Sequence, residues 1–197
     1  METTFNEQDS IRVITEMIEN SKSRIKDNSF FYLLWGWLVL IASVTNFILL
    51  KMEYFNIAWV PWPILMFGGG IVSGIAGYRM GKKAKAKTMF DTTMAYLWSG
   101  FVITLFIILF VAASGNISWQ VSNVLIIALY GLGTFVSGGI LKFKPLIIGG
   151  VLSWAIAVAT LFTPEIYSLL MVALSIVVAY LVPGYLLKSK EKSLSHV

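Results

Sequence analysis

Long apolar stretches alternate with short polar segments along most of the chain. A helix needs about 20 apolar residues to cross the hydrocarbon core of a membrane. Six stretches meet this requirement, at residues 29–50, 58–78, 92–113, 121–140, 145–162 and 166–187. A transmembrane barrel would show short strands of alternating hydrophobicity instead, whereas these stretches are continuously apolar. The pattern therefore predicts an all-α polytopic membrane protein, with six transmembrane helices forming a domain of three hairpins over residues 29–187.

The first 28 residues follow a different pattern, in which apolar residues recur at helical spacing between charged ones. The recurring residues are Ile11, Ile14, Ile18 and Ile25. This spacing predicts a cytoplasmic amphipathic helix within residues 1–28, ending at Asp27–Asn28. We expect it to lie along the inner membrane surface or under the bundle. Alternatively, residues 9–26 dock a cytoplasmic protein or a second copy of the chain.

Basic residues mark one side of the predicted bundle, because 14 of the 15 lysines and arginines fall in the segments on that side. They are Arg12, Lys22, Arg24, Lys26, Arg79, Lys82, Lys83, Lys85, Lys87, Lys142, Lys144, Lys188, Lys190 and Lys192. Only Lys51 falls on the other side. Since cytoplasmic loops carry the excess of positive charge, we expect both termini to be cytoplasmic and residues 188–197 to form a basic cytoplasmic tail. Anionic head groups explain this charge better than nucleic acid does, so no nucleic-acid partner is expected.

Composition narrows the function classes. Hydrophobic residues make up 57% of the chain and charged residues 13%, against about 25% charged in a soluble domain. The chain has no cysteine, and its one histidine is the penultimate residue, His196. No ionisable Asp, Glu, Lys or Arg lies well inside a predicted span, although such residues usually mark proton relays and ion pathways. The sequence thus predicts a protein that is not an enzyme, with no catalytic residues, no metal site and no cofactor.

An internal repeat relates the first two hairpins. A shift of 64 positions places Tyr32 on Tyr96, Gly36 on Gly100, Gly69 on Gly133, and residues 72–74 on residues 136–138. The last pair reads Val-Ser-Gly in both copies. Because each hairpin begins on the same side, the repeats are expected to be parallel, about an axis along the membrane normal.

Three hairpins that open with an aromatic-glycine segment and close with a small-glycine element resemble the bacterial six-span acid-resistance membrane proteins. Pro61 and Pro164 follow odd-numbered spans, as prolines often do in that family, while the second hairpin has no such proline. The segment at residues 31–37 is also similar to bacterial membrane proteins of this length. Both resemblances imply a helical protein of the bacterial inner (plasma) membrane, and neither implies catalytic residues.

Small residues recur on the predicted second and fourth helices, where they let helix backbones approach closely. They are Gly69, Ser73, Gly74, Gly77, Gly133, Ser137 and Gly138. We expect them to pack helices within the chain, with contacts in a homo-oligomer as the alternative.

Polar and aromatic residues within the spans have two interpretations. They are Asn46, Asn123, Tyr130, Trp154 and Tyr180. One interpretation is hydrogen bonding between helices, and the other is an intramembrane pocket around Trp154 and Tyr180. Accordingly, the sequence predicts a non-enzymatic membrane protein that acts through helix packing and through lipid or protein partners. The alternative is a carrier or channel for small neutral or lipophilic molecules.

Overall fold

The computed structural model shows helices joined by short turns. It describes the backbone of residues 7–83 and 89–195, and the side chains of residues 28–82 and 89–193. The helices are α1 (Glu7–Lys51), α2 (Pro61–Lys83), α3 (Met89–Ala113), α4 (Trp119–Ile140), α5 (Lys144–Thr160), the 3₁₀ turn η1 (Glu165–Tyr167), α6 (Ser168–Ile176), the π-helical turn η2 (Val177–Leu181) and α7 (Val182–Ser195). The expected all-helical class is confirmed over these residues.

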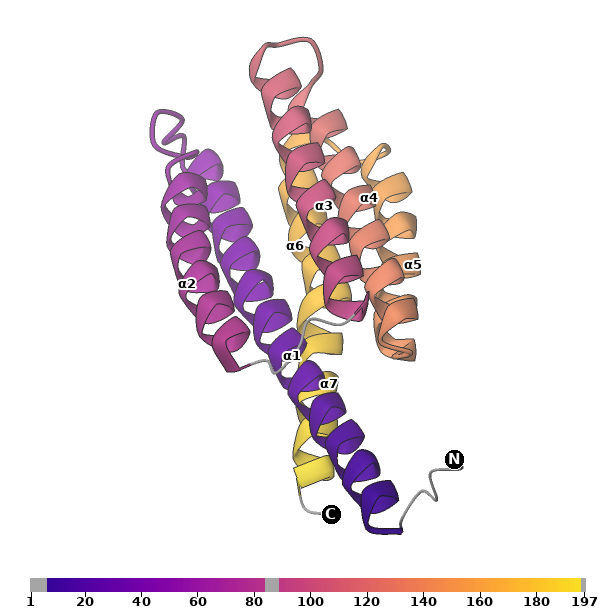
Figure 1. The fold of residues 1–197 in the computed structure, drawn as a ribbon. Coiled ribbons are helices and arrows are strands. Elements are labelled where there is room, and N and C mark those ends of the chain that lie inside the picture. The colour runs from indigo at the N-terminus through magenta and orange to yellow at the C-terminus, as the bar shows by residue number, and fades with distance from the viewer. Residues whose placement is uncertain (1–6, 84–88, 196–197) are drawn as a thin grey trace.

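The helices run alternately up and down, with η1, α6, η2 and α7 forming one continuous rod (Figure 1). Within the described part of the chain, four stretches are long and apolar enough to cross a membrane: Asn28–Lys51, Met89–Ala113, Trp119–Ile140 and Glu165–Ser193. Helix α5 is apolar but has only 17 residues. Residues 58–60, which the sequence assigned to the second span, lie instead in the turns before α2.

Packing divides the bundle into a centre and two outer helices. The rod of α6, η2 and α7 lies at the centre, where it contacts α1, α4 and α5. Helix α2 packs against α1, and α3 packs against α4. Fully buried residues such as Ile127, Leu146 and Ile176 belong to the central helices, so most of the apolar core lies between α1, α4, α5 and the rod.

Helix α1 is one continuous helix of 45 residues. The expected break at Asp27–Asn28 is therefore wrong. Neither residue is proline or glycine, so both can continue the backbone hydrogen bonding of a helix at a modest cost in propensity. The first turns of α1 project beyond the ends of α2 to α5 (Figure 1). The expected amphipathic faces and charge pairs of residues 9–26 lie outside the described side chains.

The last rod does not end at Pro183, although a proline inside a helix typically kinks or ends it. Its backbone instead makes a π-helical turn at Val177–Leu181, and α7 continues to Ser195. Proline lacks an N–H and its ring crowds the carbonyl of the preceding turn. The wider π-helical turn immediately before Pro183 accommodates both effects without ending the helix.

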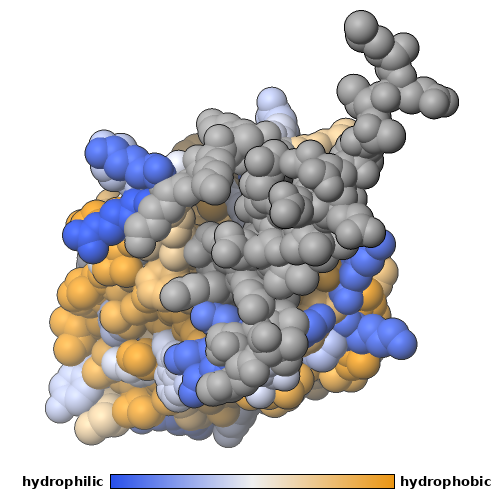
Figure 2. All heavy atoms as spheres, turned by 60° about the horizontal axis from the view of Figure 1, so that its bottom comes forward, coloured by the Kyte–Doolittle hydropathy of each residue, from blue (hydrophilic) through white to orange (hydrophobic). Residues whose placement is uncertain are grey.

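Basic side chains gather at one end of the bundle. That end holds the last turn of α2, the loop between α4 and α5, and α7. In the view of this end, hydrophilic residues lie in separate groups beside the grey atoms, and hydrophobic residues cover much of the remaining surface (Figure 2). Lys51 lies at the opposite end, with its Nζ 5.1 Å from the centre of the Tyr167 ring. The described basic residues other than Lys51 therefore lie at one end of the bundle, and the side of a membrane that this end faces stays a prediction.

Candidate functional site

Aromatic rings from four helical segments meet in the middle of the bundle. Tyr180, in the π-helical turn, lies 5.3 Å from Tyr32 of α1 and 5.4 Å from Tyr130 of α4, in edge-to-face geometry. Trp98 and Phe101 of α3 complete this tyrosine cluster, at 6.0 Å from Tyr32 and 5.6 Å from Tyr130 respectively. Each such pair adds about 0.5–1.5 kcal/mol beyond the burial of its surface. The cluster therefore joins α3 to the central helices.

Two buried hydroxyl groups in this region have no hydrogen-bond partner among the described residues. They belong to Tyr32 and to Ser137 of α4. The two side chains face each other without reaching the geometry of a hydrogen bond. A buried hydroxyl group without a hydrogen-bond partner destabilises the folded state. Tyr32 and Ser137 therefore mark a point where the hydrogen bonding of the core is incomplete.

Glycines allow the π-helical turn to lie close to α1 and α5. A Cβ atom at Gly36 would come within 2.7 Å of the Leu181 side chain, and one at Gly149 within 2.8 Å of the Val178 carbonyl oxygen. Real Cβ atoms do not approach this closely. A larger residue at Gly149 would therefore push α5 away from the turn that carries Tyr180, whereas one at Gly36 would first displace the flexible Leu181 side chain.

The structure does not bring Trp154 to the tyrosine cluster. Its ring lies 5.2 Å from Phe135, and its Nε1 donates a hydrogen bond to the carbonyl oxygen of Ala128 at 3.1 Å. Trp154 thus packs α5 against α4, and Tyr180 packs in the bundle centre, so the contacts of these two residues favour helix packing over a shared pocket.

The two asparagines differ in their surroundings. Asn123 is buried and donates a hydrogen bond from Nδ2 to the Ser168 hydroxyl group at 2.7 Å, which links α4 to α6. Asn46 is half-buried and has no hydrogen-bond partner among the residues that the structure describes. Asn123 thus serves helix packing, as one of the two interpretations from the sequence expected.

Several of the small residues lie where two helices approach closely. A Cβ atom at Gly138 would lie 2.7 Å from the backbone nitrogen of Ile147 in α5, and one at Gly69 would overlap the Leu38 side chain of α1. A Cβ atom at Gly133 would lie 3.4 Å from the ring of Phe101, which is an ordinary van der Waals distance. Ser73 is half-buried, and its enclosed hydroxyl oxygen has no partner among the described residues. These positions bring α2 to α1, α4 to α3 and α4 to α5.

Gly74 and Gly77 pack against no other described residue, which contradicts the expectation of intramolecular contacts at both positions. They share one open face of α2 with Gly70 and Gly81, and a Cβ atom at any of the four would meet nothing within 4 Å. We call these four residues the glycine face. The sequence could not separate Gly74 from Gly69, because which face of α2 meets α1 depends on tertiary packing.

Among the side chains that the structure describes, no three histidine, cysteine, aspartate or glutamate residues lie close enough to hold a metal ion. Sequence reasoning missed Tyr32, Trp98 and Phe101 as partners of Tyr130 and Tyr180. The spacing of Trp98 and Phe101, three residues apart on one helix face, was the available signal. Comparison with protein families, with curated proteins and with solved structures finds no match, so the resemblance to acid-resistance membrane proteins stays a prediction.

Proposed function

We propose that this is a non-enzymatic integral membrane protein that acts by packing against a second copy of itself through the glycine face of α2. In this proposal α1 to α5 and the rod of η1, α6, η2 and α7 all cross the inner membrane, and both termini are cytoplasmic. Helices α2 and α5 run alongside the four apolar spans (Figure 1). Helix α2 has 23 residues, which gives it a length of about 35 Å.

One observation carries the proposal: equivalent positions of the internal repeat differ in what covers them. Gly138 of α4 is covered by α5, whose backbone lies within 2.7 Å of an added Cβ atom. Gly74 is its equivalent on α2, and it is exposed with open space around it. In the second hairpin an apolar helix, α5, therefore packs on Gly138 at close backbone distance. No described helix packs on Gly74 in the first hairpin.

The sequence of the glycine face fits such a partner. Gly70 and Gly74 form one Gly-x-x-x-Gly pair, and Gly77 and Gly81 form a second pair. In a membrane, such pairs let two helix backbones approach until dispersion and weak hydrogen bonds hold them. Lipid chains alone gain little from a flat glycine surface, so the face favours a helix as its occupant.

The alternative of a carrier or channel has less support. The rings of Tyr32 and Tyr130 both contact the ring of Tyr180 in the middle of the bundle, and all three residues are at most 6% exposed. A solute would have to displace these packed rings to cross there.

The proposal is tested by measuring self-association in lipid vesicles. Because the chain has no cysteine, Asn116→Cys supplies a single labelling position for a donor or an acceptor dye. Energy transfer between labelled chains in phosphatidylcholine vesicles should rise with the number of chains per lipid. Gly74→Leu should weaken this association about tenfold, because the leucine side chain holds the two backbones apart.

Gly68→Leu is the matched control. Gly68 lies on the same helix and also has open space around it, but it does not share the face of Gly74. The Gly68→Leu chain should associate as strongly as the unmodified chain. Equal association of the Gly74→Leu and Gly68→Leu chains, or energy transfer no higher than random proximity gives, would refute the proposal.

A further inference from the structure

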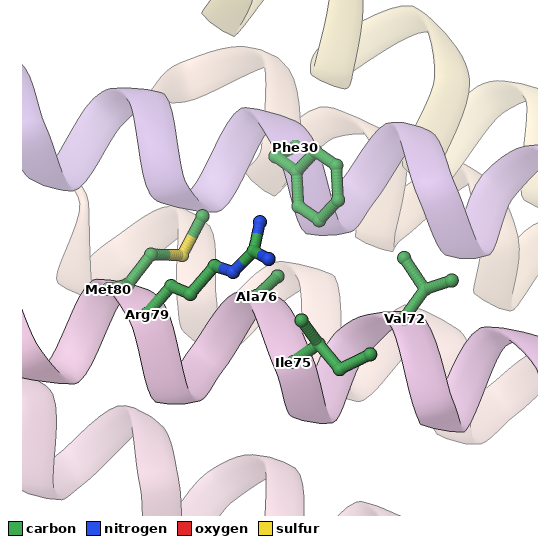
Figure 3. A pocket seen from close by; sticks show the side chains of 6 residues that line it. All are labelled: Phe30, Val72, Ile75, Ala76, Arg79 and Met80. Atoms are coloured by element: carbon green, nitrogen blue, oxygen red, sulfur yellow. The ribbon is translucent and has the colours of Figure 1, made fainter.

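A groove opens between α1 and α2 near the end of the bundle where the basic residues gather. Its volume is about 420 Å³, which lies within the range of ligand sites. One residue of α1 and five of α2 line it: Phe30, Val72, Ile75, Ala76, Arg79 and Met80 (Figure 3). Five of the six side chains are apolar, and the sixth carries a positive charge.

Arg79 gives the groove its chemistry. Its guanidinium group points into the groove, toward α1 (Figure 3). Among the side chains that the structure describes, residues 28–82 and 89–193, no acidic one lines the groove. The structure gives Arg79 no ion pair or hydrogen bond to any other described residue. An arginine placed between apolar side chains has no negative charge beside it to stabilise its positive charge. A planar guanidinium group pairs best with a phosphate or a carboxylate through two parallel hydrogen bonds.

The place of Arg79 along α2 matches the boundary of a membrane. An apolar stretch from Ile64 to Tyr78 precedes it, and Lys82 follows one turn later. The guanidinium group therefore lies where hydrocarbon meets head groups, while Val72 and Ile75 lie one to two turns deeper. An occupant that satisfies the whole groove needs an anion at the boundary and an apolar chain below it.

We propose that the groove between α1 and α2 binds an anionic phospholipid, with its phosphate on Arg79 and an acyl chain against Phe30, Val72 and Ile75. The groove and the glycine face lie on different sides of α2, since their residues recur at different helical positions. A lipid in the groove and a second chain on the glycine face can therefore be bound together, and failure of one proposal leaves the other standing.

Native mass spectrometry of the full chain in detergent tests this site, with dioleoyl phosphatidylglycerol and dioleoyl phosphatidylcholine as probes. The first phosphatidylglycerol molecule should bind about tenfold more tightly than phosphatidylcholine. Arg79→Gln should remove most of this difference. Arg79→Lys should keep part of it, because the charge remains but the paired hydrogen bonds do not.

Lys82→Gln is the charge-matched control. Lys82 lies near the same end of α2, but its Nζ is engaged 4.6 Å from the centre of the Tyr78 ring. Its loss should change phosphatidylglycerol affinity less than about threefold, because screened surface charges contribute little. Equal losses for Arg79→Gln and Lys82→Gln would show general charge attraction and would overturn the site, as would full affinity in Arg79→Gln.

The apolar part of the groove is tested separately. Val72→Trp should fill it and weaken phosphatidylglycerol binding, while Ile71→Trp, at an exposed neighbouring position outside the groove, should not. Unchanged binding in both tryptophan variants would refute the placement of the acyl chain. Inorganic phosphate at millimolar concentration should not displace the lipid, and displacement would mean that Arg79 holds a free anion instead.

Discussion

An added methyl group should change stability differently at Gly138 and Gly74, two positions that the sequence treats as equivalent. In Gly138→Ala the new Cβ atom would lie 2.7 Å from the backbone nitrogen of Ile147 and 2.8 Å from the Cβ atom of Leu146. Crowding is relieved only near 3.4 Å, so α4 and α5 must part locally by about 0.7 Å, the difference between these distances. A gap of that size forfeits a quarter to a half of the dispersion attraction between facing atoms.

The expected cost of Gly138→Ala is about 1–3 kcal/mol, because the nearest atom is backbone and cannot rotate away. Gly74→Ala meets open space and should leave stability unchanged or slightly raised, since alanine favours the helix. The assay is the free energy of unfolding from detergent titration, with no more than one chain per micelle. If both variants lose the same free energy, the close approach of α4 to α5 is not what holds this region.

Three further outcomes follow from the structure. Tyr32→Phe should keep or raise the unfolding free energy, because it removes a buried hydroxyl group without a partner; a clear loss would mean that this hydroxyl group is hydrogen-bonded in the membrane. Single cysteines at Asn116 and Glu165 should react with an impermeant reagent from outside the cell, and one at Lys188 should not; the reverse labelling would invert the topology. Deletion of residues 2–26 should leave the helices inserted, because the apolar stretches carry the insertion signal, and protease protection of the remaining loops measures this.

Some features required only the order of residues. The all-helical class follows from continuous apolar stretches, because a chain in lipid must satisfy its backbone hydrogen bonds within each helix. The gathering of basic residues at one end follows from alternating helices joined by short turns. Local chemistry also placed some helix ends: Ser118 accepts a hydrogen bond from the Val121 backbone nitrogen at the start of α4, as serine does at helix starts.

Other expectations failed because local signals do not determine tertiary packing. Asp27–Asn28 lowers helix propensity but removes no backbone hydrogen bond, so α1 continues through it. Pro183 removes a hydrogen bond, yet a π-helical turn absorbs the loss and the helix goes on. In both cases the sequence contains residues that disfavour a helix, and the surrounding structure determined that the helix continues through them.

The sequence by itself determined where the long apolar helices of this protein lie, apart from their ends, because continuous apolar stretches depend on neighbouring residues alone. Only the tertiary structure decided which face of each helix is covered. Gly74 and Gly138 share the same local sequence, but α5 lies over Gly138 and no described helix lies over Gly74. Tyr130 and Tyr180 meet while Trp154 packs elsewhere, and Arg79 turns toward a groove that exists only between α1 and α2. Contacts of this kind depend on how far apart helices lie and how they are rotated, and no single helix carries that information.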